Sequence, residues 1–275
     1  MKPTRPSRFR RGQSTVETAL TLPFSIILLL GMIQLFMMQQ ARIVAQVAAA
    51  RSARAGSVYF GDCERMTHAA IGVLIPTFAH FLSPTAPRFD DSAGGRFAKA
   101  FQIHSGNKYD PAYDKISVTG AGVVPLDGPI VWLDRTLTQM RSIGTPSAPL
   151  INVSGNRDDE EFDNPAGGHV LTVDMVYWYP LRLPFVNSFI AKLALSRWSA
   201  SYAYKEFNPF MPIRPANFTA TGSSPPSEIV DEFALRVFKF NQFVFPIRVN
   251  SSIRMFTPPR PMHFKSGGYI QDRCL

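Results

Sequence analysis

Cysteine is scarce in this sequence: Cys63 and Cys274 are the two among 275 residues. They form no CxxC motif and no other spacing that builds a zinc site. Two interpretations stay open, because pairing cannot be deduced from sequence. The cysteines are unrelated thiols, or they form a disulfide in an oxidising compartment and close nearly the whole chain after its N-terminal segment. Such a bridge would contribute roughly 4–5 kcal/mol in the chain-entropy model.

Motifs of catalysis and of metal binding are also missing. The five histidines show no ligand spacing such as HExxH, there is no GxSxG, and no glycine pair is followed by a phosphate-loop lysine and serine. The acidic run 158–163 lacks the glycine and the alternating oxygens of an EF-hand, so we interpret it as a solvated loop, with a weak Ca²⁺ site as the alternative. We expect a protein that is not an enzyme and that uses no cofactor or metal.

Negative charge is absent from the first twelve residues, which contain five cations. These five make up more than half of the formal charge of +9. The basic excess is therefore concentrated ahead of an apolar run, a pattern typical of membrane targeting. We expect no nucleic-acid partner.

Charge of either sign is absent from residues 18–38, TALTLPFSIILLLGMIQLFMM, where Gln34 is the one strongly polar side chain. About 20 such residues cross the roughly 30 Å of a bilayer's hydrocarbon. The run exceeds the apolar core of about 7–15 residues in a signal peptide, so it predicts a single-pass transmembrane helix. A signal peptide cleaved near the small residues 48–50 remains the alternative. The basic flank places residues 1–12 in the cytoplasm and the bulk of the chain outside it.

Helical spacing of apolar residues continues beyond the uncharged run, and Gly56 is a suitable stop. The sequence predicts one helix over about 14–55, with a kink at Pro23. The chain is accordingly divided into a basic cytoplasmic leader (1–12), a transmembrane and continuing helix (13–56) and an extracytoplasmic domain (57–275).

Glu17 lies one residue before the uncharged run, where an acid is costly. It is either a hydrated carboxylate that complements the helix dipole or a functional group. Gly12, five residues earlier and after the basic leader, completes a pattern that resembles the type IV prepilin cleavage site. With the Glu-x-Ala-Leu-x-x-Pro run through Pro23 and the closing AARSARAG, residues 13–56 resemble the N-terminal segment of TadE/TadG-like proteins, the pseudopilins of the Tad (tight adherence, Flp pilus) secretion system. A looser resemblance covers 168–206.

This resemblance implies that a prepilin peptidase cuts between Gly12 and Gln13. Glu17 would then pair with the new N-terminal amine of a neighbouring subunit and favour lateral association of helices. The implied partners are the peptidase, other pilins and pseudopilins, and the pilus assembly platform. The implied location is the bacterial inner membrane, with or without incorporation in a pilus. The implied role is that of a minor pseudopilin in pilus biogenesis, secretion and cell adhesion, and an uncleaved, membrane-tethered binding or adhesion module is the alternative.

The domain 57–275 is expected to be α+β and pilin-like, with a small antiparallel sheet and short helices. Alternating and β-branched patterns predict strands near 116–119, 170–179 and 198–204. Apolar residues at helical spacing predict helices near 64–82, 129–141, 185–195 and 227–238. Beyond Phe207 no resemblance to a family is present.

Overall fold

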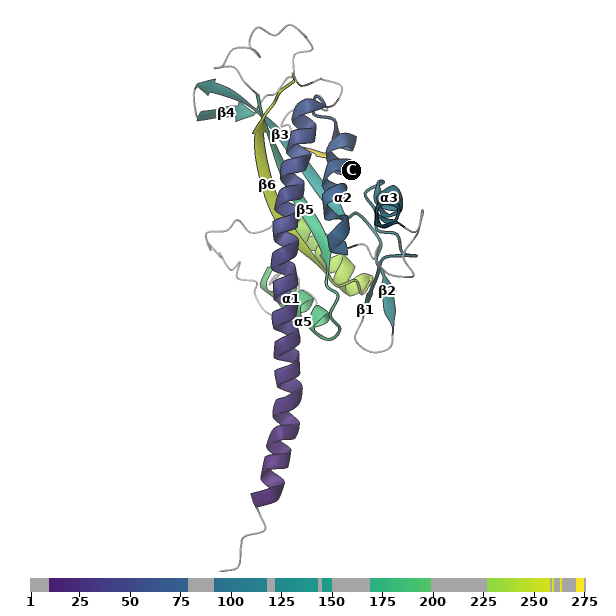
Figure 1. Ribbon diagram of the computed structural model, residues 1–275. Helices are drawn as coiled ribbons and strands as arrows, with labels where there is room; N and C mark the ends of the chain where they lie inside the picture. The colour runs from purple at the N-terminus through teal and green to yellow at the C-terminus, as the bar shows by residue number, and fades with distance from the viewer. Residues whose placement is uncertain are drawn as a thin grey trace, which may run out of the picture.

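The computed structural model describes residues 10–78, 92–117, 122–142, 145–149, 169–198, 227–257, 259, 263 and 271–274. A long helix runs along one side of an antiparallel sheet and extends well beyond it, as Figure 1 shows. The elements are α1 (Arg10–Val58), α2 (Cys63–Phe78), α3 (Ala93–His104), β1 (Lys115–Ser117), β2 (Val123–Pro125), β3 (Val131–Ser142), β4 (Thr145–Pro149), β5 (His169–Pro180), α5 (Val186–Trp198), α7 (Ser227–Ala234), the π-helical turn η1 (Leu235–Lys239), β6 (Val244–Arg254) and β7 (Gln271–Cys274).

The main sheet has the order β4-β3-β5-β6, and β7 adds to β3. All its pairings are antiparallel. The central strand β5 is rich in β-branched and aromatic residues, which suit a pleated surface with neighbours on both sides. β1 and β2 form a separate two-stranded sheet. Together with the helices this is the expected α+β class.

The two faces of β5 differ. Leu171, Val173 and Met175 are buried on the face that α1 and α2 cover, whereas Asp174 on the other face is exposed. Farther along the strand the second face is covered too. There Trp178 lies edge-on to Trp132 at 5.1 Å between ring centroids, and the Arg236 guanidinium of η1 is 4.6 Å from its ring centroid. Alternation of buried and less buried side chains is therefore confined to the half of β5 up to Asp174, where one face of the sheet is open to solvent.

The helix predicted over 129–141 is wrong, because this segment is strand β3. Its apolar residues Ile130, Leu133 and Leu137 have a spacing that suits a helix, but burial within the strand alternates: Leu133, Arg135 and Leu137 are buried, and Asp134 and Thr136 are half-buried. Nine consecutive pairs with β5, from Val131 to Gln139, decide the conformation. Tertiary pairing overrides local spacing at this site.

The other predicted elements fall close to observed ones. The helices over 64–82, 185–195 and 227–238 correspond to α2, α5 and α7 with η1, and the strands over 116–119 and 170–179 correspond to β1 and β5. Trp198, predicted to begin a strand, instead ends α5, and 199–204 lie outside the described residues. Helix α1 continues through Pro23 without interruption.

Candidate assembly helix and its docking to the domain

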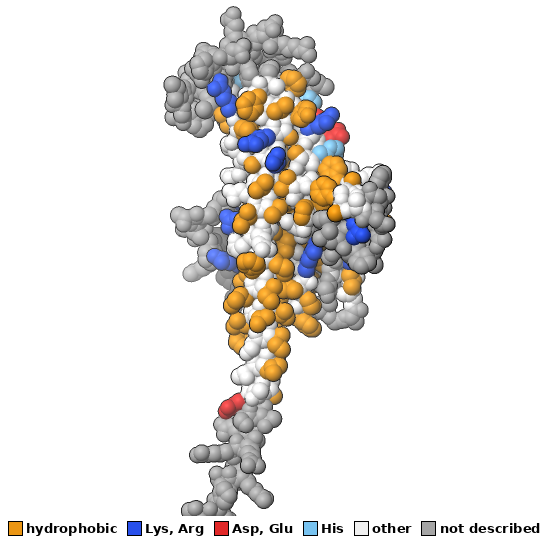
Figure 2. All heavy atoms as spheres, in the orientation of Figure 1, with side chains coloured by type: hydrophobic (Ala, Val, Ile, Leu, Met, Phe, Trp, Pro, Cys, Tyr) orange, Lys and Arg blue, Asp and Glu red, His pale blue; other side chains and the backbone are white. Residues whose placement is uncertain are grey.

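The N-terminal part of α1 stands clear of the domain. Every residue from Glu17 to Leu29 is exposed, including large apolar side chains such as Leu20 at 72% and Phe24 at 68%. In Figure 2 apolar side chains gather along this part of the helix and around the adjoining base of the domain. Helix α1 is the one candidate membrane span among the described residues, over Glu17–Val58. An exposed apolar rod of this kind requires lipid or other helices around it.

Two hydroxyls in this rod, those of Thr21 and Ser25, are satisfied within the helix. Thr21 donates to the Glu17 carbonyl at 2.9 Å, and Ser25 donates to the Thr21 carbonyl at 2.9 Å. Such internal bonds remove the cost of placing a hydroxyl in hydrocarbon, where water is unavailable. These polar side chains are therefore compatible with a membrane segment.

Gly12, Gln13 and Glu17 all lie in α1, which begins at Arg10. Gln13 and Glu17 are four residues apart on a continuous helix, so they share one of its faces. Glu17 is exposed, while the side chain of Gln13 lies outside the described set. The processing role of Gly12 and Gln13 and the assembly role of Glu17 stay predictions.

The C-terminal part of α1 is held by the domain through small side chains. The buried face consists of residues with little volume: Ala41, Ala45, Ala48, Ala49, Ser52 and Ala53. At Gly56 an added Cβ would lie 2.6 Å from Leu171 Cδ2 and 2.7 Å from Met66 Sδ. Close packing leaves no room for a larger residue there. Arg51 and Arg54 are exposed, so the AARSARAG run alternates a packed face with a basic outer face.

Gln34 has a structural role that the sequence did not reveal. Its side chain is fully buried, and its Oε1 accepts a hydrogen bond from the Leu183 backbone amide at 3.1 Å. Nearby, Val186 Cγ1 lies 4.0 Å from the position of a Cβ on Gly31. The segment leading into α5 thus docks on α1 inside the uncharged run. A lone polar residue in such a run was the available signal.

The segment that docks on Gln34 is fixed in turn to the end of α2. Arg182 donates to the carbonyls of Thr77 at 3.3 Å and of Phe78, which are terminal carbonyls of that helix. An arginine at this position satisfies carbonyls that have no hydrogen-bond partner within the helix, and its positive charge complements the helix dipole. The Thr77 hydroxyl lies 2.6 Å from the Tyr177 hydroxyl on β5. Burial raises the pKa of Tyr177, which keeps its hydroxyl protonated.

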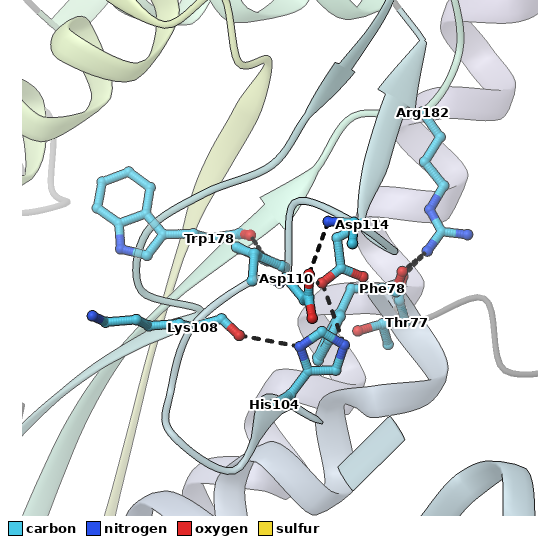
Figure 3. Close-up of polar contacts among 10 residues, drawn as sticks. Thr77, Phe78, His104, Lys108, Asp110, Asp114, Trp178 and Arg182 are labelled. Atoms are coloured by element: carbon cyan, nitrogen blue, oxygen red, sulfur yellow. Dashed lines mark hydrogen bonds and ion pairs between the residues drawn. The ribbon is translucent and has the colours of Figure 1, made fainter. Parts of the chain in front are cut away.

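A second polar cluster links α3 to the loop before β1 (Figure 3). The His104 Nε2 atom lies 3.3 Å from Asp114 Oδ2, and its Nδ1 lies 3.1 Å from the Lys108 carbonyl oxygen. The Asp110 amide donates to the same Asp114 oxygen at 2.8 Å. Burial raises the pKa of Asp114, while the charge of His104 and the Asp110 amide act in the opposite direction. Both ring nitrogens of His104 have partners within the protein, so we interpret this cluster as a structural connection between α3 and the loop before β1.

Cys63 and Cys274 are joined in the structure by a disulfide with a Cα–Cα distance of 5.2 Å. The bond connects the first residue of α2 with the last residue of β7. Around it Ala53, Met66, Leu133 and Leu171 form a small apolar cluster. The C-terminal strand is thereby attached to the helical layer as well as to β3.

In a comparison with known families, residues 12–54 match the model of the family described as TadE-like protein. The resemblance inferred for the N-terminal segment is confirmed, and the looser one over 168–206 lies outside the match. Neither the curated proteins nor the solved structures gave a match. The match suggests a protein associated with Tad pili, and the apolar helix suggests membrane anchoring.

Proposed function

From the TadE-like N-terminal segment, we propose that this chain is a minor pseudopilin of a Tad-type pilus system with a structural, non-catalytic role. A prepilin peptidase cuts between Gly12 and Gln13, and the mature chain remains in the inner membrane with its domain outside the cytoplasm. The observation that carries this proposal is the family match, which begins at Gly12 and ends at Arg54. Its partners are the peptidase, other pilins and pseudopilins, and the assembly platform.

The form of α1 supports assembly by helix packing. The rod from Glu17 to Leu29 offers apolar side chains on every side, and the domain covers α1 only from Leu30 onward. A carboxylate at the end of such a rod is stabilised by a cation, and the amine of Gln13 in a processed neighbour supplies one. Pairing of this kind brings helices together side by side.

The packing of α1 also argues against a cleaved signal peptide. A cut near residues 48–50 would remove Ala41 and Ala45, which are buried in the main apolar core, together with Gln34 and its bond to the Leu183 amide. The domain would lose one layer of its core. A cut after Gly12 leaves all of these contacts in place.

The processing step can be tested by intact-mass measurement of the membrane-bound protein from cells with and without a prepilin peptidase. We expect loss of residues 1–12 in the wild type, and no loss in Gly12→Ala or in peptidase-null cells. Gly31→Ala is the matched control, because its added Cβ meets one side-chain atom at an ordinary 4.0 Å. A start at Met1 in every strain would contradict the proposal, as would a start at Arg51.

One observation favours the alternative of an uncleaved, tethered binding module. A groove beside α7 is lined by Trp132, Leu235 and Phe238, with the carboxylates of Glu228 and Asp231 along it. Lys239 also lines the groove, and the carboxylate of Glu232 is paired with Arg236 at 2.7 Å. Apolar walls with nearby carboxylates suit a segment with basic and apolar side chains. An intact Met1 together with binding of such a peptide, abolished by Trp132→Ala, would favour this alternative.

A further inference from the structure

The free part of α1 is too short to cross a bilayer alone. Residues 17–29 rise about 20 Å at roughly 1.5 Å per residue, whereas the hydrocarbon core is about 30 Å thick. The uncharged run begins at Thr18, and domain contacts begin at Leu30. A spanning α1 therefore places the base of the domain in the outer part of the bilayer, at the level of about the last 10 Å of hydrocarbon.

The base at this level is α5 with the segment that leads into it. Leu183 and Val186 meet α1 near Gln34 and Gly31, as described above. In Figure 1 α5 lies beside α1 at the lower end of the domain. The Leu183 amide and the Gln34 oxygen satisfy each other, whereas the buried Gln34 Nε2 has no hydrogen-bond partner among the described residues.

Helix α5 has apolar residues on both of its faces. Val186, Ala191 and Leu195 are buried against the domain. The opposite face has Phe189 and Leu193, four residues apart, with exposed fractions of 62% and 57%, and Phe185, the residue just before the helix, is 61% exposed. Residues at this spacing form one stripe along a helix surface. Lys192, Ser196 and Arg197 are exposed beside this stripe, and such a mixture of apolar and basic side chains suits a helix at a membrane interface.

Two further features distinguish this stripe from an ordinary surface. Phe185 has a φ of 65°, a left-handed conformation that is uncommon for a bulky residue and that recurs at functional positions. Lys192 is exposed on α5 next to Leu193. A lysine there can lay its alkyl stem along apolar surface and extend its ammonium group to lipid phosphates.

We propose that α5 is a second membrane-contact element, which inserts Phe185, Phe189 and Leu193 into the bilayer leaflet remote from the basic leader. The bilayer is the occupant, because the short free length of α1 already brings this face to hydrocarbon depth. Two points of contact hold the domain at a fixed height and tilt above the membrane. The inference rests on anchoring by α1 and is independent of peptidase processing.

The test uses the full-length chain in phosphatidylethanolamine–phosphatidylglycerol vesicles, with a photoreactive benzoylphenylalanine at one position. Phe189 is the test position and Leu22 on the free rod is the positive control. Phe256 is the matched exposed phenylalanine at 69%, at the other end of the domain, where its amide donates to the Ser57 carbonyl. Survival of the Cys63–Cys274 disulfide checks folding of each variant. Mass spectrometry identifies what each position labels.

We expect lipid adducts at Phe189 in a yield similar to that at Leu22 and several-fold above that at Phe256. Lipid adducts at Leu22 with none at Phe189 would overturn the inference while leaving the anchor intact. Adducts between Phe189 and a second copy of the chain, in place of lipid, would also overturn it. Absence of lipid adducts at both Phe189 and Leu22 would overturn the anchoring on which the inference rests.

Discussion

At the scale of single residues, Asp174 on β5 lies directly opposite Asp134 on β3. Like charges in facing positions destabilise a sheet. Partial desolvation raises the pKa of Asp174, the charge of Asp134 adds to the increase, and the charge of Arg248 opposes it. A carboxyl group whose folded pKa exceeds its unfolded value of 3.8 is most favourable to folding when protonated, and this benefit is lost as the pH rises through the folded pKa.

Asp174→Asn should therefore stabilise the domain at pH 7 and change little near pH 3. Because Asp174 is exposed, we expect a gain of only about 0.2–1 kcal/mol in the free energy of unfolding. Thermal melts of the detergent-solubilised protein at both pH values measure the effect. Asp174→Glu keeps the charge and should give no gain. Equal stabilisation at the two pH values would exclude the electrostatic explanation.

At the scale of elements, α1 changes its role along its length. Up to Leu29 its surface is exposed and apolar, domain contacts begin at Leu30, and from Ala41 a stripe of small side chains packs on the domain, where α1 contacts α2, β5 and β6. Ala49 is fully buried in this stripe, and the adjacent Ala50 is exposed. Leucine and alanine both favour helices, so replacing either of these residues with leucine leaves the helix propensity nearly unchanged. A difference in stability between the two variants therefore reports on packing.

Ala49→Leu should destabilise the domain by about 1–3 kcal/mol, because extra methylenes in a packed core force side chains and backbone apart. Ala50→Leu should change the free energy of unfolding by less than about 0.5 kcal/mol, as is usual for surface positions. Denaturant titration followed by near-ultraviolet circular dichroism measures both variants. Similar losses in the two variants would show that the buried face of α1 does not pack as described.

At the scale of the whole molecule, the disulfide joins residues 211 positions apart and holds the two ends of the domain together. Its sulfur atoms lie within the cluster of Ala53, Leu133 and Leu171, so α1, the sheet and the C-terminal strand meet there. A cross-link over so long a loop restricts the unfolded chain strongly.

Removing the bond with a Cys63→Ala, Cys274→Ala double variant should cost about 2–5 kcal/mol of stability. A reductant should lower the melting temperature of the wild type to that of the double variant and leave the double variant unchanged. Calorimetry of the detergent-solubilised protein with and without reductant makes the comparison. A wild type insensitive to reductant, with free thiols detected after the treatment, would contradict this contribution.

Local pattern alone determined the parts of this protein whose conformation depends on near neighbours. An uncharged run followed by residues at helical spacing specifies α1, and a β-branched, aromatic stretch specifies β5. The family resemblance also follows from sequence, because Gly12, Glu17, Pro23 and the AARSARAG run stand in one continuous segment. The structure adds the reason for that last run: Ala49, Ser52, Ala53 and Gly56 pack inward, while Ala50, Arg51 and Arg54 face outward.

Contacts between distant segments were decided by the tertiary structure. β3 is a strand because it pairs with β5, although its apolar spacing also suits a helix. The sequence left the cysteine pairing open and offered no partner for Gln34, since Leu183 and Cys274 lie far along the chain. The same holds for α5: its apolar stripe is visible in sequence, but only its docking on α1 places it at membrane depth. Long-range contacts carry no local periodicity, and packing alone selects them.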